Sequence, residues 1–163
     1  MPDGKETLIF ALAEELRRRS MMCASAESCT GGLIGAMLTA VPGSSEWYAG
    51  GVISYANSVK EGLLGVSAQD LEQHGAVSEP VVRAMAFGVC RAVGAGAGMA
   101  VSGVAGPGGG TVEKPVGTVW IGWCVNGEVC SRKFLFSGNR DEVRLQAARA
   151  AMAGLLECLK KEH

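Results

Sequence analysis

Hydrophobic and polar positions along the chain follow two periods, one typical of helices and one typical of strands. Leu8, Leu12 and Leu16 recur every four residues within residues 6–19, which predicts an amphipathic helix. Short apolar runs predict buried strands at residues 21–26, 51–56 and 99–104. Further helices are expected at residues 33–38, 57–64, 67–75, 78–89 and 139–159.

Two β-rich runs, residues 116–125 and 129–136, flank the dipeptide Asn126-Gly127. This dipeptide favours the two-residue turn of an antiparallel hairpin, since both residues tolerate the left-handed backbone conformation. Strands that alternate with helices and end in a hairpin predict an α/β fold. We therefore expect residues 1–163 to form a single three-layer α/β/α domain, with a mixed, mostly parallel central sheet that contains one antiparallel hairpin.

The composition excludes several classes of protein. Hydrophobic residues make up 48% of the 163 residues and charged residues 19%, which excludes a disordered chain. A net charge of -1 and an aromatic content of 6% argue against nucleic-acid binding. The apolar runs end well before the ~18 residues that a membrane span needs. We expect a cytoplasmic protein with no nucleic-acid or membrane partner. The mean hydropathy of +0.21 favours a homodimer or a higher homo-oligomer.

The six cysteines show no C-x-x-C motif and no spacing typical of a zinc site. We expect free thiols, no disulfide, no metal and no cofactor. The cysteines stand at positions 23, 29, 90, 124, 130 and 158.

Ser28 is the first candidate for chemistry, because it lies where a predicted strand ends and Thr30-Gly31-Gly32 opens a helix. The N–H groups at a helix N-terminus can stabilise an oxyanion or bind a phosphate. Ser28 can therefore be a nucleophile, part of a phosphate site or simply a helix cap. The motif G-x-S-x-G is absent, so the nucleophile turn of the α/β-hydrolases is not present.

A serine nucleophile needs a base, and the positions of His74 and His163 argue against a Ser-His-Asp triad. Lys60 follows a predicted buried strand and is the candidate for a Ser-Lys pair. Its pKa would have to fall by about 3 units for it to act near neutral pH. The alternative is a solvated lysine on a helix surface.

Two further features can bind a ligand. The glycine-rich residues 103–111 follow a predicted strand and can bring a ligand against bare backbone, or they form a flexible turn. They are not a Walker-type phosphate loop, because no Lys-Ser/Thr pair follows. Arg140 and Arg144 begin the last predicted helix, and either can bind a phosphate or belong to a solvated face.

Seven motifs in one order resemble the CinA C-terminal domain family, over about residues 6–160. The family includes stand-alone nicotinamide-nucleotide amidases. The motifs are A-E-S-C-T-G-G at 26–32, V-P-G-S-S at 41–45, Y-A-N-x-x-K at 55–60, L-G-V at 64–66, H-G-A-V-S at 74–78, G-V-A-G-P-G-G at 103–109 and K-P-V-G-T-V at 114–119. The resemblance implies hydrolysis of the carboxamide of nicotinamide mononucleotide (NMN), giving nicotinic acid mononucleotide and ammonia in pyridine nucleotide salvage.

The resemblance also implies roles for residues. Ser28 matches the family's nucleophile and Lys60 its base, while Tyr55 matches a tyrosine that can relay protons or orient that lysine. Cys29, beside Ser28, is not expected to be the nucleophile. Ser102 stands where the family more often has threonine, and Arg140 matches an arginine that can bind the phosphate. The residues expected to bind substrate are Thr30, Gly31, Gly32, Asn57, Ser102, Gly106, Gly108, Gly109 and Arg140.

A second reading stays open beside the enzyme. Many family members carry this unit behind an N-terminal domain with metal-dependent pyrophosphatase activity, and no metal requirement is expected to come with the C-terminal unit. The alternative function is a non-catalytic nucleotide-binding module of the competence/damage-inducible CinA type. The presence of both Ser28 and Lys60 favours the enzyme.

Overall fold

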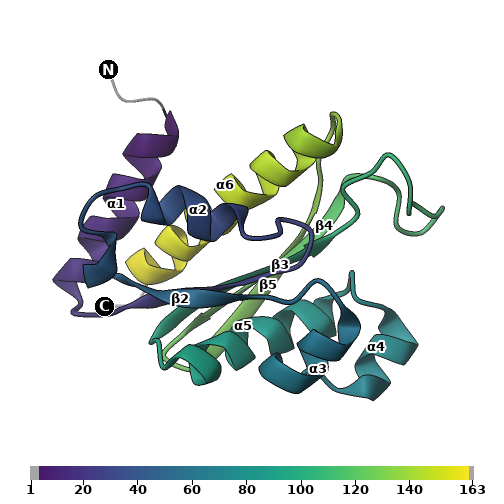
Figure 1. Ribbon diagram of the computed structural model, residues 1–163, viewed down its shortest axis with the longest axis horizontal. Coiled ribbons are helices and arrows are strands. Elements are labelled where there is room, and N and C mark those ends of the chain that lie inside the picture. Colours follow the sequence, from purple (N-terminus) through teal and green to yellow (C-terminus); the bar gives the residue numbers. More distant parts are fainter. Residues whose placement is uncertain (1–3, 162–163) are drawn as a thin grey trace.

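The computed structural model describes residues 4–161 and contains one five-stranded sheet flanked by helices (Figure 1). The strands lie in the order β2-β1-β3-β4-β5. In chain order the elements are α1 (Gly4–Arg18), β1 (Cys23–Glu27), α2 (Leu33–Thr39), η1 (Ser44–Glu46), β2 (Tyr48–Ile53), α3 (Asn57–Leu64), α4 (Ala68–His74), α5 (Glu79–Val93), β3 (Ala97–Gly103), β4 (Thr118–Val125), β5 (Glu128–Leu135) and α6 (Arg140–Lys161).

The sheet is mixed. β1 lies in its parallel half and pairs with β2 on one side and β3 on the other. β4 is antiparallel to both β3 and β5, so it alone runs against the other strands. Asn126 and Gly127, with φ of 51° and 84°, form the turn between β4 and β5. The predicted α/β fold and its hairpin are confirmed.

Helices cover both faces of the sheet and give the predicted three layers (Figure 1). α1, α2 and α6 pack on one face, over a core that includes Leu12, Ile34 and Met152. α3, α4 and α5 lie on the other face, over a smaller core that includes Leu64 and Met85. The carboxyl ends of β1, β2 and β3 therefore meet between two helical layers, where open α/β sheets bind their ligands.

The sequence misplaced one strand by three residues. The apolar run at 51–56 predicts a strand, whereas β2 spans Tyr48–Ile53. Gly50 and Gly51 hid its start, because glycine carries little strand signal. Gly51 is required there, since a Cβ at this position would lie 2.5 Å from the Ser25 carbonyl oxygen on β1.

Side-chain caps fix two helix starts that the sequence predicted. The Ser67 hydroxyl accepts a hydrogen bond from the Asp70 N–H at 3.0 Å, at the start of α4. At the start of α6, the Asn139 side chain accepts from the Glu142 N–H at 2.9 Å. The Glu142 carboxylate in turn accepts from the Asn139 N–H at 3.1 Å. This reciprocal pair is a capping box, and it fixes the helix turn that carries Arg140.

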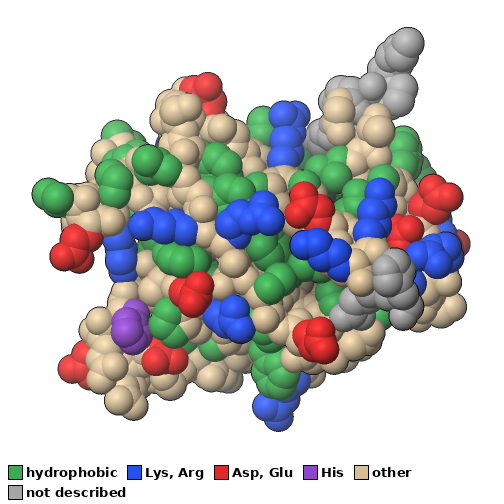
Figure 2. Space-filling view, turned by 180° about the vertical axis from the view of Figure 1, so that it is seen from behind, with side chains coloured by type: hydrophobic (Ala, Val, Ile, Leu, Met, Phe, Trp, Pro, Cys, Tyr) green, Lys and Arg blue, Asp and Glu red, His purple; other side chains and the backbone are tan. Residues whose placement is uncertain are grey.

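The surface carries charge of both signs. Figure 2 shows one face, on which Lys and Arg side chains are interspersed with Asp and Glu. On this face the basic side chains do not form a one-sided patch of the kind that is typical of nucleic-acid-binding surfaces. Within residues 4–161, every helix falls short of the length and apolar character needed to cross a membrane.

Candidate active site

Ser28 lies directly after β1, where the chain turns sharply into α2. Its N–H donates a hydrogen bond to the Val101 carbonyl of β3 at 3.0 Å, so the serine stays attached to the sheet. Gly31 and Gly32 then adopt φ of 57° and 103°, a conformation that other residues rarely take. The side chain of Ser28 is thus fixed at the carboxyl edge of the sheet, and only 8% of the residue is exposed.

Glu27, the last residue of β1, fixes the turn that leads into α2. The sequence motifs indicated no role for this residue. Its buried carboxylate accepts hydrogen bonds from the N–H groups of Ile34 at 2.8 Å and Gly35 at 3.0 Å. A carboxylate at a helix N-terminus is stabilised by the dipole of the helix. Because Glu27 occupies these donors, the start of α2 is not free to bind a phosphate. An acidic residue just before a strand–turn–helix junction was the signal for this contact.

Lys60 reaches Ser28 from the first turn of α3. Its Nζ donates to the Ser28 Oγ at 3.0 Å, and also to the carbonyl oxygens of Ser54 at 2.6 Å and Tyr55 at 3.2 Å. The lysine is buried, with 1% of its surface exposed. Within residues 4–161 it has no carboxylate partner at ion-pair distance. Burial lowers the pKa of Lys60 below its ordinary value.

The fold explains why the lysine meets the serine. β2 is the parallel neighbour of β1, and the Ser54 N–H extends their pairing by donating to the Glu27 carbonyl at 2.8 Å. α3 starts three residues later and packs tightly on α5. A Cβ at Gly88 of α5 would lie 1.9 Å from the Leu64 carbonyl oxygen, so only glycine allows α3 to approach so closely.

Arg144 of α6 holds the backbone that follows Ser28. Its Nε donates to the Cys29 carbonyl at 3.0 Å and its Nη2 to the Thr30 carbonyl at 2.9 Å. In a trans peptide the N–H points away from the carbonyl, so Arg144 turns the Thr30 N–H to the opposite side. The Gly31 N–H donates to the Ser28 carbonyl at 3.1 Å and is already occupied. Thr30 N–H is therefore the better placed of the two to hold an oxyanion.

Cys29 has the wrong protonation state for a nucleophile. Its thiol is buried, and burial raises its pKa to about 11. The thiol is therefore neutral at neutral pH, whereas a thiolate is the reactive form.

Arg140 lies on the rim of the site. Its Nη1 donates to the Gly106 carbonyl at 2.8 Å, and its Nη2 lies 3.4 Å from the Tyr55 hydroxyl. It also lines a cleft of about 630 Å³, large enough for a nucleotide-sized ligand. The other residues that line this cleft are Ala105, Pro107, Val116, Gly138, Asn139 and Asp141.

Tyr55 contacts Lys60 through its backbone and Arg140 through its side chain. Its carbonyl accepts a hydrogen bond from Lys60, whereas the residue as a whole is 64% exposed and its hydroxyl faces Arg140. The Tyr55 hydroxyl therefore lies beside Arg140, whereas the contact with Lys60 is made by the Tyr55 backbone carbonyl.

The other expected site residues differ in their burial and their contacts. The buried Ser102 hydroxyl donates to the Ala76 carbonyl at 2.8 Å. Asn57, Gly108 and Gly109 are exposed, whereas Gly106 is buried. His74 accepts a hydrogen bond from the Lys114 Nζ, but through its backbone carbonyl, and His163 lies outside the described residues. Within residues 4–161, nowhere do three or more His, Cys, Asp or Glu side chains gather as a metal site would require.

The sequence profile of the CinA C-terminal domain matches residues 5–159. The chain belongs to the CinA C-terminal domain family. The resemblance seen in the sequence motifs is thereby confirmed. A family member from Enterobacter agglomerans, named nicotinamide-nucleotide amidohydrolase PncC, is 53% identical over 142 residues, which is 86% of this chain and 87% of that protein. The protein of the same name from Pseudomonas putida is 48% identical over 155 residues, covering 95% of this chain and 97% of that protein.

Longer family members contain this unit as a part. A CinA-like protein from Gemmatimonas aurantiaca is 49% identical over 160 residues, and the chain spans 37% of its length. Among solved structures, a CinA superfamily protein from Klebsiella pneumoniae superposes with a TM-score of 0.93 at 37% identity, over 98% of this chain and 99% of that chain. The competence/damage inducible protein CihA from Agrobacterium tumefaciens gives 0.92 at 37% identity, over 98% of each chain.

Proposed function

We propose that this chain is a nicotinamide-nucleotide amidase, a single-domain unit that hydrolyses the carboxamide of NMN to nicotinic acid mononucleotide and ammonia. The contact between the buried Lys60 and Ser28, at 3.0 Å, is the observation that carries the proposal. A nucleophile and its base must lie within hydrogen-bond reach, and the base must be able to lose its proton. The PncC names of the relatives that match along most of their length support the choice of substrate.

The reaction proceeds in two halves. Neutral Lys60 takes the proton of Ser28 while the serine oxygen attacks the carboxamide carbon. Thr30 N–H stabilises the oxyanion that forms. Lys60 then gives its proton to the leaving nitrogen, ammonia departs, and a nicotinoyl ester remains on Ser28. Water, deprotonated by Lys60, cleaves the ester and frees the serine.

Residues at the rim of the site, Arg140 and Tyr55 among them, recognise the parts of the substrate outside the carboxamide. Arg140 is a bidentate donor, which suits the phosphate of a mononucleotide. The exposed ring of Tyr55 lies beside it, and an aromatic face attracts a cation such as the pyridinium ring of NMN. The buried Gly106 and the exposed glycines 108 and 109 let the ribose approach the backbone closely.

Ammonia release from NMN by the purified chain tests the proposal. We expect steady release, and a loss of about 10³-fold or more in Ser28→Ala, because the nucleophile is removed and the neighbouring Cys29 thiol is neutral at neutral pH. Calorimetric titration with NMN measures binding separately. Binding without ammonia release by the unaltered chain would overturn the enzyme and support the alternative, a non-catalytic nucleotide-binding module. Its supporting observation is the Arg140 cleft, which can bind a nucleotide without chemistry.

A further inference from the structure

Two thiols face each other on the side of the molecule formed by β5 and the end of α6. The Sγ atoms of Cys130 on β5 and Cys158 on α6 lie 3.4 Å apart. Cys130 is exposed and Cys158 is half-buried. All six cysteines are free thiols, and this pair includes the one that is exposed to solvent.

The pair opens to solvent through a cleft of about 240 Å³. The residues that line this cleft are Trp123, Val125, Glu128, Val129, Cys130, Cys158 and Lys161. A small oxidant can therefore reach both sulfur atoms. Within residues 4–161 no third metal-binding side chain joins them, so the pair falls short of the three or four ligands of a zinc site. The geometry therefore favours a disulfide between the two sulfurs over a metal site.

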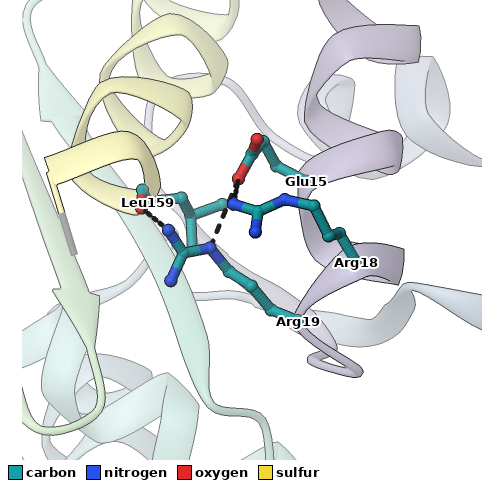
Figure 3. A network of polar contacts seen from close by, with 4 residues as sticks. All are labelled: Glu15, Arg18, Arg19 and Leu159. Carbon is teal, nitrogen blue, oxygen red and sulfur yellow. Dashed lines mark hydrogen bonds and ion pairs between the residues drawn. The ribbon is translucent and has the colours of Figure 1, made fainter. Parts of the chain in front are cut away.

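The end of α6 that carries Cys158 is held in place on its other side. Arg19, just after α1, donates through Nη2 to the Leu159 carbonyl and through Nε to the Glu15 carboxylate at 3.3 Å (Figure 3). Arg18 donates to the same carboxylate at 2.9 Å. Because Leu159 is adjacent to Cys158, this network ties the last turns of α6 to the end of α1. The helix end that carries Cys158 is thus fixed in place, with its sulfur 3.4 Å from that of Cys130.

We propose that Cys130 and Cys158 form a modification site, which a two-electron oxidant of the peroxide class converts to an intramolecular disulfide. The Cys130 thiolate attacks a peroxide oxygen, the O–O bond breaks, and a sulfenic acid and water form. The Cys158 sulfur then attacks the sulfenic sulfur, the S–O bond breaks, and a second water leaves with the remaining proton. Two thiols are oxidised and one peroxide is reduced to two waters.

Burial assigns the order of these steps. Burial and the neighbouring Cys130 thiol raise the pKa of Cys158 to about 12, so Cys158 is the poorer first nucleophile. The exposed Cys130 therefore reacts first, and Cys158 resolves the intermediate. The bond would tie the edge strand β5 to the last turns of α6. Along the helix, Cys158 lies about 21 Å, at 1.5 Å per residue, from Arg144, which binds the carbonyls of Cys29 and Thr30, so the site is separate from the Ser28–Lys60 pair.

Hydrogen peroxide treatment of the reduced, purified chain tests this inference. After remaining thiols are alkylated, intact mass and peptide mapping identify the product. We expect a chain that is not covalently linked to a second copy and has lost the mass of two hydrogens, one cross-linked peptide joining Cys130 to Cys158, and full reversal by dithiothreitol. The variant Cys130→Ser should lose this product.

Cys90→Ser is the matched control, because Cys90 is also half-buried and its thiol lies beside another, that of Cys124. It should form the Cys130–Cys158 bond as the unaltered chain does. The inference fails if Cys130 and Cys158 remain alkylatable after peroxide, or if Cys130 proceeds to a sulfinic acid. It also fails if the cross-linked peptide joins other cysteines or two separate chains.

Discussion

Two glycine-rich segments leave neighbouring strands at the same edge of the sheet, yet they are built in opposite ways. Residues 28–32 follow β1, and Thr30 within them is fully buried. Lys60 of α3 and Arg144 of α6 hold this segment, and Glu27 of β1 holds the helix start that follows it. Residues 104–116 follow β3 and extend away from the body of the molecule (Figure 1), and Val112 near their tip is fully exposed.

The difference suits the two tasks that the proposed function requires of one site. A nucleophile, its base and an oxyanion donor must keep fixed positions, since a displacement of about 1 Å can cost about 10²-fold in rate. Contacts with substrate outside the reacting group tolerate exposed backbone, which can close on a ligand. The first segment suits chemistry and the second suits binding. Substitutions in the first should therefore lower kcat, and those near the second should raise KM.

Replacing Lys60 with Met should have the largest effect. The apolar side chain keeps the length of the lysine stem but cannot take the Ser28 proton, so kcat for ammonia release should fall by about 10²- to 10⁴-fold. NMN binding, measured by calorimetry, should be retained. A variant that keeps more than a tenth of the activity would remove Lys60 from the mechanism.

The pH dependence sharpens this test. Because burial lowers the pKa of Lys60, kcat/KM should rise with pH and level off below the ordinary lysine pKa of ~10.4. Between the lowered and the ordinary pKa the unfolded chain binds one more proton, so stability should also rise with pH there. Lys60→Met should lack this contribution to stability. A rate that falls as pH rises would reverse the assigned base.

Replacing Arg144 with Met should reduce kcat by about 10²-fold while changing KM little. The two hydrogen bonds that orient the Thr30 peptide would be lost, and with them the fixed position of the oxyanion donor. Arg140→Met, one helix turn earlier, should instead raise KM, because Arg140 lines the cleft in which we propose that the nucleotide binds. Equal effects of the two substitutions on kcat and KM would contradict the division of the site.

Gly88→Ala tests the close packing of α3 on α5, which positions Lys60 beside Ser28. The added Cβ would clash with the Leu64 carbonyl, so α3 must move, and unfolding free energy should fall by about 1–3 kcal/mol. The expected loss in kcat is less than that of Arg144→Met. Gly62→Ala is the matched control, because Gly62 lies in α3 with open space around its Cβ position. It should raise stability slightly, by about 0.5–1 kcal/mol, since alanine favours the helix. Chemical denaturation measures both.

The sequence predicted the features that depend on neighbouring residues and missed those that depend on contacts between distant elements. Local patterns predicted the strand–turn–helix around Ser28, the hairpin at Asn126-Gly127 and the bounds of α3. Contacts between distant elements were not predictable from spacing. Arg144 lies 115 residues from Cys29, and nothing in its helix indicates which carbonyl it will bind. Glu27 belongs to the A-E-S-C-T-G-G motif, but the motif does not indicate its contact with Ile34 and Gly35, because that contact depends on how sharply the chain turns. The roles of the site residues stay predictions.

Val112→Ser should have the smallest effect. Val112 is fully exposed and lies outside both the Ser28 segment and the lining of the Arg140 cleft. Exposed positions of this kind usually change stability by less than about 0.5 kcal/mol. We expect kcat/KM for NMN to stay within about twofold and the thermal midpoint to be unchanged.

Light scattering should give the same mass for this variant as for the unaltered chain, and the same measurement tests whether the chain forms the expected homo-oligomer. A raised KM at unchanged mass would mean that residues 104–116 close over the ligand until Val112 touches it. Binding by the exposed segment would then depend on side chains as well as on bare backbone.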